Sequence, residues 1–168
     1  MMEPLQPPQS HYLSAAIGWL ELGRPDEARA ELEALPAEFQ RHPDVLEARW
    51  LLEAGEQRWE EALRAARTLI EVAPERPSGW LHQAYALRRT ATGGLQAAWD
   101  ALRPSVERFP KEPIIPFNLA CYACQMGRLE AARQWLGRAF AIGDKAHLRA
   151  LALADADLQP LWEEIRNA

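Results

Sequence analysis

Four alanines, Ala28, Ala62, Ala98 and Ala132, recur 34, 36 and 34 residues apart inside segments that resemble one another. A period of this length is typical of stacked helical hairpins, in which each hairpin buries its apolar face against its neighbours. An array of this kind offers an extended surface rather than a reaction centre. The period therefore predicts an all-α chain whose role is binding.

The composition agrees with one continuous array. Of the 168 residues 48% are hydrophobic, which is ample for a shared core. The formal charge of −5 removes the broad attraction that nucleic acid or an anionic membrane requires, so we expect neither as a partner. The first ten residues hold three prolines but no basic start and no apolar run, which predicts no export signal, no anchor and a cytoplasmic location.

The first helix of each predicted hairpin also carries an alanine on its contact face. Two antiparallel helices interlock closely only where one offers a small side chain to a larger one on the other. We expect both sets of alanines to be buried and aromatic side chains to fill the gaps between hairpins. The second set of alanines is Ala16, Ala48, Ala84 and Ala120, and the aromatic residues include Tyr12, Trp19 and Trp80.

Local signals predict where the helices end. Gly23 and Gly127 can adopt the left-handed conformation that stops a helix, and Pro36 ends the second helix of the first hairpin. We expect residues 55–58 to lengthen the second turn and residues 89–94 to lengthen the third.

The chain resembles tetratricopeptide repeat (TPR) proteins from about His11 to Asp144, and small bacterial members in particular. The resemblance rests on the repeated large and small positions above, on the segments 118–124 and 127–132, and on the stretch from Ala150 to Trp162. It implies a right-handed superhelical solenoid of about four hairpins, with capping helices after them. It also implies protein or peptide binding, with no catalysis and no cofactor.

The predicted organisation has three parts. A flexible proline-rich leader occupies residues 1–9, and four hairpins occupy 10–42, 43–76, 77–112 and 113–144. Residues 145–168 are expected to cap the last hairpin, with Leu158, Leu161, Trp162 and Ile165 covering its apolar face.

In such an array the first helix of each hairpin lines a hollow side, which is the predicted peptide-binding groove. Counting one helical face away from Ala16, Ala48, Ala84 and Ala120 gives the candidate residues. They are Leu13, Ile17, Leu20 and Glu21; Val45, Arg49, Leu52 and Glu53; Leu81, Tyr85, Arg88 and Arg89; and Phe117, Asn118, Cys121, Cys124 and Gln125.

The arginines of this set suit a peptide with acidic and hydrophobic side chains or a free carboxylate. The alternative is that they are solvated and pair with Glu21 or Glu53. Some TPR proteins grip the carboxyl-terminal tail of chaperones with a fixed set of asparagines, lysines and an arginine. Only Asn118 matches that set, because Leu13, Ile17, Ser78 and His82 occupy other positions of it, so the resemblance implies no such clamp.

Other functions remain open. The chain could self-associate through an exposed hairpin edge, or its leader could fill the groove. Cys121 and Cys124 form a C-x-x-C pair that raises thiol redox chemistry or metal binding. They lie in the middle of a predicted helix, and the four histidines show no paired spacing, so we expect buried thiols, no metal site and no enzyme. Asp155 and Asp157 are expected to cap a helix rather than to bind a metal.

Overall fold

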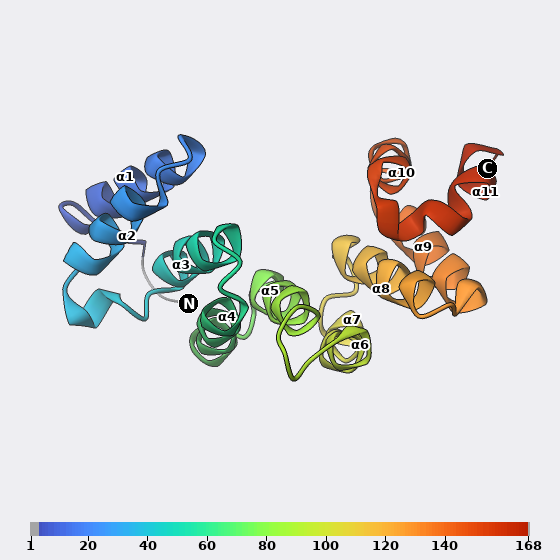
Figure 1. Ribbon diagram of the computed structural model, residues 1–168, viewed down its shortest axis with the longest axis horizontal. Coiled ribbons are helices and arrows are strands. Elements are labelled where there is room, and N and C mark those ends of the chain that lie inside the picture. The colour runs from blue at the N-terminus through green and yellow to red at the C-terminus, as the bar shows by residue number, and fades with distance from the viewer. Residues whose placement is uncertain (1–3, 168) are drawn as a thin grey trace. The chain divides into compact units, whose positions relative to one another are not determined.

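The computed structural model describes residues 4–167, and within them the regular structure is helical, without strands (Figure 1). The all-α prediction is confirmed. The chain divides into two compact units, residues 1–90 and 91–168. The division falls inside the third predicted hairpin, and the units are described separately below as unit 1 and unit 2.

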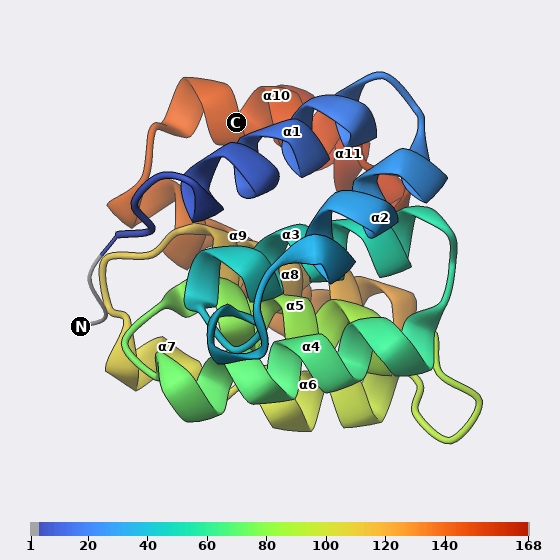
Figure 2. The ribbon, with the colours of Figure 1, turned by 90° about the vertical axis from the view of Figure 1, so that its left-hand side faces the viewer.

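Unit 1 is built from paired helices. The first pair is α1 (Gln9–Glu21) and α2 (Pro25–Ala34), and a short 3-10 helix, η1 (Ala37–Phe39), leads to α3 (Pro43–Gly55), α4 (Trp59–Val72) and α5 (Pro77–Leu87). Each helix packs against the next along the chain, and α3 also packs against α1 and α5. Figure 2 shows α3 and α4 lying alongside each other.

Unit 2 contains one full hairpin and its cap. It begins with α6 (Leu95–Leu102) and α7 (Ser105–Arg108), followed by the pair α8 (Ile114–Gln125) and α9 (Leu129–Ile142). Then come α10 (Lys145–Ala154), the 3-10 helix η2 (Ala156–Leu161) and α11 (Trp162–Asn167). Pro104 separates α6 from α7, because proline has no N–H to continue the helical hydrogen bonds.

The residues after Asp144 cover the last hairpin, as predicted. Asp144 caps α10 by accepting from the backbone N–H groups of Ala146 and His147, at 3.0 and 3.1 Å. α10 packs on α9, and η2 packs on both α8 and α9. The buried residues that close this face are Leu158, Leu161 and Ile165; Trp162 is half-buried.

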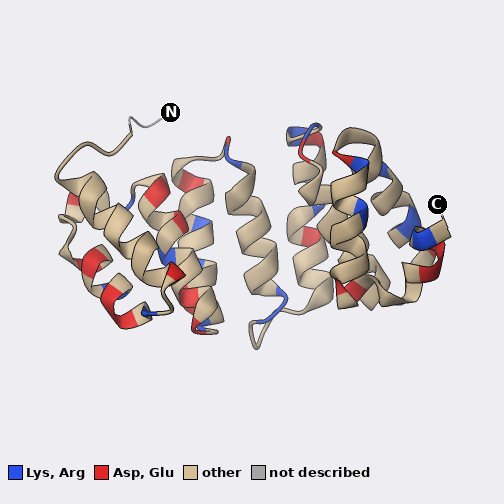
Figure 3. Cartoon of the chain, turned by 90° about the horizontal axis from the view of Figure 1, so that it is seen from above, with Lys and Arg blue, Asp and Glu red and all other residues tan. Residues whose placement is uncertain are grey.

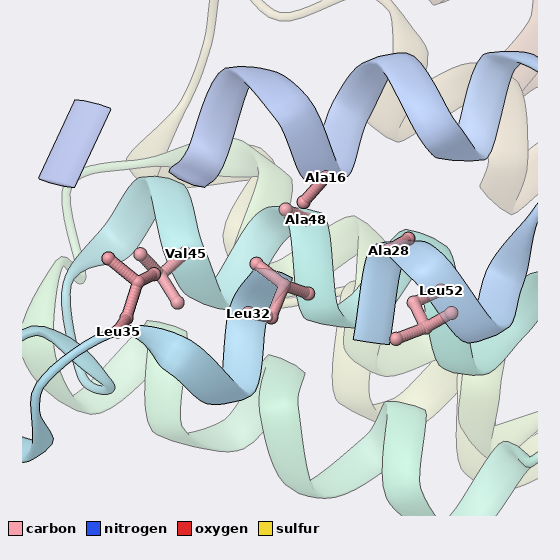
Figure 4. Packing of buried hydrophobic residues seen from close by; sticks show 7 residues of the cluster. All are labelled: Ala16, Ala28, Leu32, Leu35, Val45, Ala48 and Leu52. Carbon is pink, nitrogen blue, oxygen red and sulfur yellow. The ribbon is translucent and has the colours of Figure 1, made fainter. Parts of the chain in front are cut away.

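Both predicted sets of alanines are buried. All eight are at most 1% exposed: Ala16, Ala48, Ala84 and Ala120 on the first helices, and Ala28, Ala62, Ala98 and Ala132 on the second helices. In Figure 4, Ala16 on α1 lies beside Ala48 on α3, and the leucines of α2 and α3 fill the space around them. The small residues therefore stand where backbones approach most closely.

Three hairpin turns share one hydrogen-bonding pattern. In each, a residue with positive φ follows the first helix: Gly23 at 68°, Gln57 at 59° and Gly127 at 74°. The next backbone N–H then donates back to the first helix at 2.8 Å, from Arg24 to Trp19, from Arg58 to Glu53 and from Arg128 to Ala123. The predictions for Gly23 and Gly127 are confirmed.

The expected lengthening of the second turn is wrong. α1 spans residues 9–21 and α3 spans residues 43–55, so every position of the first hairpin turn recurs 34 residues later. Gly55 is the last residue of α3, and Gln57 takes the left-handed position that glycine holds elsewhere. The third connection is longer, as predicted, because residues 88–94 separate α5 from α6.

The predicted leader is only partly described. Residues 1–3 lie outside the described residues, and α1 already begins at Gln9. Leu5 is half-buried and packs against the core between α1, α2 and α3.

Candidate functional site

Three large apolar residues on the first helices of unit 1 stand in equivalent positions and are exposed. Ile17 on α1, Leu51 on α3 and Tyr85 on α5 follow one another at intervals of 34 residues. Their side chains are 40%, 50% and 39% exposed. Because α3 packs against both α1 and α5, equivalent positions on these helices follow one another across one face. We call Ile17, Leu51 and Tyr85 the apolar stripe.

The stripe moves the predicted groove on α3 to another face. The predicted residues Val45 and Leu52 are 0% and 1% exposed and belong to the core that α3 shares with the first hairpin. Arg49 is half-buried, and it stands two residues from Leu51, which is about 200° around the helix. On α3, therefore, Val45, Arg49 and Leu52 do not lie beside Ile17 and Tyr85, and Leu51 does.

Aromatic rings surround Tyr85. Its ring lies 5.7 Å from that of Trp50, edge on, and 6.0 Å from that of Trp59. The Arg89 guanidinium stands 3.6 Å from the Tyr85 ring centre and 5.1 Å from that of Trp59, an arrangement in which the cation is attracted to the ring faces. One end of the stripe is therefore a rigid aromatic surface that carries a positive charge.

His82 supports the same aromatic group from below the surface. Its ring stacks on Trp50 with the ring centres 3.9 Å apart and an angle of 6° between the planes. Burial lowers the pKa of His82 to about 4, against a smaller opposing influence of Glu47. At neutral pH the imidazole is therefore uncharged and packs as an aromatic ring.

A polar bridge joins α3 to the start of α5. The Arg76 guanidinium lies 2.7 Å from Asp44 and 3.2 Å from Glu47, and the Ser78 hydroxyl donates to Glu47 at 2.7 Å. Glu47 precedes Leu51 by one helical turn, so the bridge lies on the same side of α3 as the stripe. The acidic residues at these positions are thus satisfied by α5 and its N-terminal residue.

The remaining candidates of unit 1 differ in exposure. Leu13 and Leu20 are half-buried against the first core, and Leu81, Arg88 and Arg89 are also half-buried. Glu21 is exposed. Glu53 is buried and bound to arginines outside the predicted set: Arg29 donates to it at 2.8 and 3.3 Å, and Arg58 lies 3.2 Å away. The hydrogen bond to Glu53 raises the pKa of Arg29.

In unit 2 most of the predicted groove residues are covered. Phe117, Cys121 and Cys124 are buried on α8, while Gln125 is exposed and donates to the carbonyl of Asp157 at 3.0 Å. Asn118 donates to the carbonyl of Ile114 at 2.9 Å, so its amide is engaged by its own helix.

The two cysteines are free thiols in a buried setting. Cys121 Sγ donates to Asp155 Oδ2 at 3.5 Å. Burial raises the pKa of Cys124, and the carboxylates of Asp157 and Asp155 add to that effect. Asp155 also accepts from the backbone N–H of Asp157 at 2.9 Å, which caps η2. Among residues 4–167 the histidine, cysteine and acidic side chains form no group of three or more that could hold a metal ion.

The membrane prediction can be checked on helix length and hydropathy alone. Over the described range, none of the helices is both long enough and apolar enough to cross a bilayer. Acidic and basic residues are instead interspersed over the helices of each unit (Figure 3).

Comparison with known proteins identifies the fold. No model of a protein family matches the chain, and no curated protein matches its sequence. The thermophilic TPR protein TTC0263 of Thermus thermophilus matches with a TM-score of 0.72 and 19% sequence identity, over 94% of this chain and 82% of that chain. The structure MamA MSR-1 C2 matches with a TM-score of 0.64 and 20% identity, over 82% of this chain and 78% of that chain. The chain therefore has the tetratricopeptide repeat fold.

Proposed function

We propose that this protein is a non-catalytic interaction module that binds a segment of another protein along the apolar stripe of unit 1. The observation that carries the proposal is the exposure of Ile17, Leu51 and Tyr85 at the same position of successive first helices. Leaving three large apolar side chains in water at regular intervals is unfavourable unless a partner covers them.

The chemistry around the stripe suggests what the segment contains. Apolar side chains of the segment would contact Ile17 and Leu51. The Tyr85 end favours an acidic neighbour, because Arg89 stands over the ring and its guanidinium hydrogen-bonds only to the carbonyl of Tyr85, at 3.0 Å, among the described residues. The segment is thus apolar with an acidic residue, the partner that the arginines of the sequence also favour.

Binding by this surface fits the raised pKa of Cys124 better than redox chemistry does, because a reactive thiol needs a lowered pKa. We place the module in the cytoplasm, because its two cysteines are free thiols and a reducing compartment keeps thiols in that state. Its partner is a protein, neither nucleic acid nor lipid, since the net charge of −5 opposes both polyanions.

The test uses a defined probe. Displayed random peptides of about 12 residues are selected on the immobilised full chain, and a fluorescein-labelled copy of the selected peptide is titrated by fluorescence anisotropy. We expect a Kd in the micromolar range, weakened at least about tenfold by Leu51→Glu or Ile17→Glu.

The matched control is Leu22→Glu, which makes the same substitution at a side chain that is 72% exposed but lies in the turn after α1. It should bind as the parent does. If the stripe variants keep the parent's affinity, the stripe is not the binding surface. Sedimentation of the parent distinguishes self-association, since a dimer that Leu51→Glu dissociates would mean that the stripe joins two copies of this chain.

A further inference from the structure

A separate cleft of about 640 Å³ opens between α2, α3 and α4 of unit 1. It reaches the side of α3 that carries Arg49, about 200° around the helix from Leu51, so it does not belong to the apolar stripe. Buried Leu46 and Ala65 form its apolar part. Its other lining residues are Glu33, Gln40, Arg41, Arg49, Glu53, Glu61, Arg64 and Thr68.

Arg49 is held in this cleft by a neutral partner. Its Nη2 donates to Gln40 Oε1 at 2.6 Å. Gln40 is itself fixed, because its Nε2 donates to the backbone carbonyls of Leu32 and Leu35 at 2.9 and 2.8 Å. The guanidinium is therefore positioned in advance, and most of its N–H donors remain unused.

No carboxylate among residues 4–167 lies within ion-pair distance of Arg49. The neighbouring charges are already matched: Glu53 by Arg29 and Arg58, and Glu61 by Arg58 at 3.7 Å and Arg64 at 3.4 Å. Arg41 pairs with Glu71 at 3.1 Å. Glu33 is exposed, so water screens its charge.

We propose that this cleft is a second binding site, which accepts an acidic side chain of a protein partner with its carboxylate on Arg49. A half-buried guanidinium without a counter-charge gains most from an acceptor that takes two parallel N–H bonds, and a carboxylate is such an acceptor. The acidic residues of the cleft disfavour a doubly charged phosphate more than a singly charged carboxylate. The site is independent of the apolar stripe.

The probe is a capped pentapeptide of alternating alanine and glutamate, and its glutamine counterpart is the uncharged control. Each is titrated into the full chain with isotope-labelled arginine side chains, and the Nε–H signals are followed by NMR. The Arg49 signal is the one that disappears in Arg49→Gln. We expect the glutamate peptide to shift the Arg49 signal to saturation and the glutamine peptide to leave it in place.

Variants then separate the site from general charge effects. Arg49→Gln should weaken binding at least about tenfold, and Arg49→Lys, which keeps the charge but loses the fork, should weaken it by a smaller factor. Arg67→Gln removes the same charge from an exposed position of α4 outside the cleft and should bind as the parent does. Leu51→Glu should also bind as the parent does, so a failure of the proposed function leaves this result unaffected.

Three results would overturn the proposal. The Arg49 signal could stay in place, the glutamine peptide could shift it equally, or Arg67→Gln could weaken binding as much as Arg49→Gln. If inorganic phosphate shifts the signal at a lower concentration than the glutamate peptide does, the assignment to a carboxylate is wrong.

Discussion

Replacing Gln57 by glycine is expected to stabilise unit 1, although it shortens a side chain. Gln57 has a φ of 59°, in the left-handed region where Gly23 and Gly127 stand in the equivalent turns. A residue with a Cβ pays about 1–2 kcal/mol for this conformation. Glycine avoids that cost but loses about 0.5–1 kcal/mol through the greater freedom of its unfolded chain. The difference favours Gln57→Gly by about 0.5–1 kcal/mol.

Urea denaturation followed by tryptophan fluorescence measures this difference, and a thermal scan should show a rise in Tm of about 1–4 °C. Gly23→Gln is the reverse exchange in the same unit and should destabilise by a similar amount. A Cβ added at Gly23 meets no atom within 4 Å, so only the backbone is tested. Glu56→Gly, at a φ of −88°, has no strain to relieve and should also destabilise. If Gln57→Gly destabilises as much as Glu56→Gly, the reasoning from the left-handed turn is refuted.

Three further outcomes are expected. Ala132→Arg should destabilise by more than about 3 kcal/mol in a thermal scan, because Ala132 is 0% exposed between helices, whereas Ala141→Arg on the exposed face of α9 should melt like the parent. His82 has a pKa of about 4 when folded and about 6.5 when unfolded, so the unfolded chain takes up the proton first and stability falls as the pH falls. Its contribution between pH 7 and pH 5 is a loss of about 2 kcal/mol, which His82→Phe should remove from the urea midpoints; equal pH dependence in both proteins would contradict it. Cys124 should react slowly with a thiol reagent at neutral pH and rapidly in urea, because burial raises its pKa; a fast reaction in the folded protein would restore the redox alternative.

The sequence predicted the hairpins because the same physical requirement recurs in each of them. Close approach of two helices demands a small side chain, and Ala28, Ala62, Ala98 and Ala132 mark that requirement at every repeat. Gly23 and Gly127 mark the turns for a comparable reason, since glycine adopts positive φ without strain. Features that are imposed at every hairpin can be read from the period.

The groove on α3 was predicted wrongly because one turn lacks its glycine. Gly55 suggested a turn two residues early, and the structure places Gln57 in the left-handed position. A shift of two residues turns a helix by about 200°, which exchanges Leu51 for Arg49 and Leu52. The arginine that follows the left-handed residue in all three turns, Arg58 in this hairpin, is the signal that would have fixed the register.

The cleft around Arg49 shows why the period could not predict every site. Its key contact, from Arg49 to Gln40, depends on the irregular connection between α2 and α3, which has no counterpart between α4 and α5. Gln40 reaches Arg49 only because its amide is held by the carbonyls that α2 leaves open at its C-terminal end. Repeated positions determine where the helices lie, whereas this arginine is positioned by a segment that interrupts the repetition. A binding site formed in that way belongs to this chain rather than to the array, and it can be found only once the connection is seen folded.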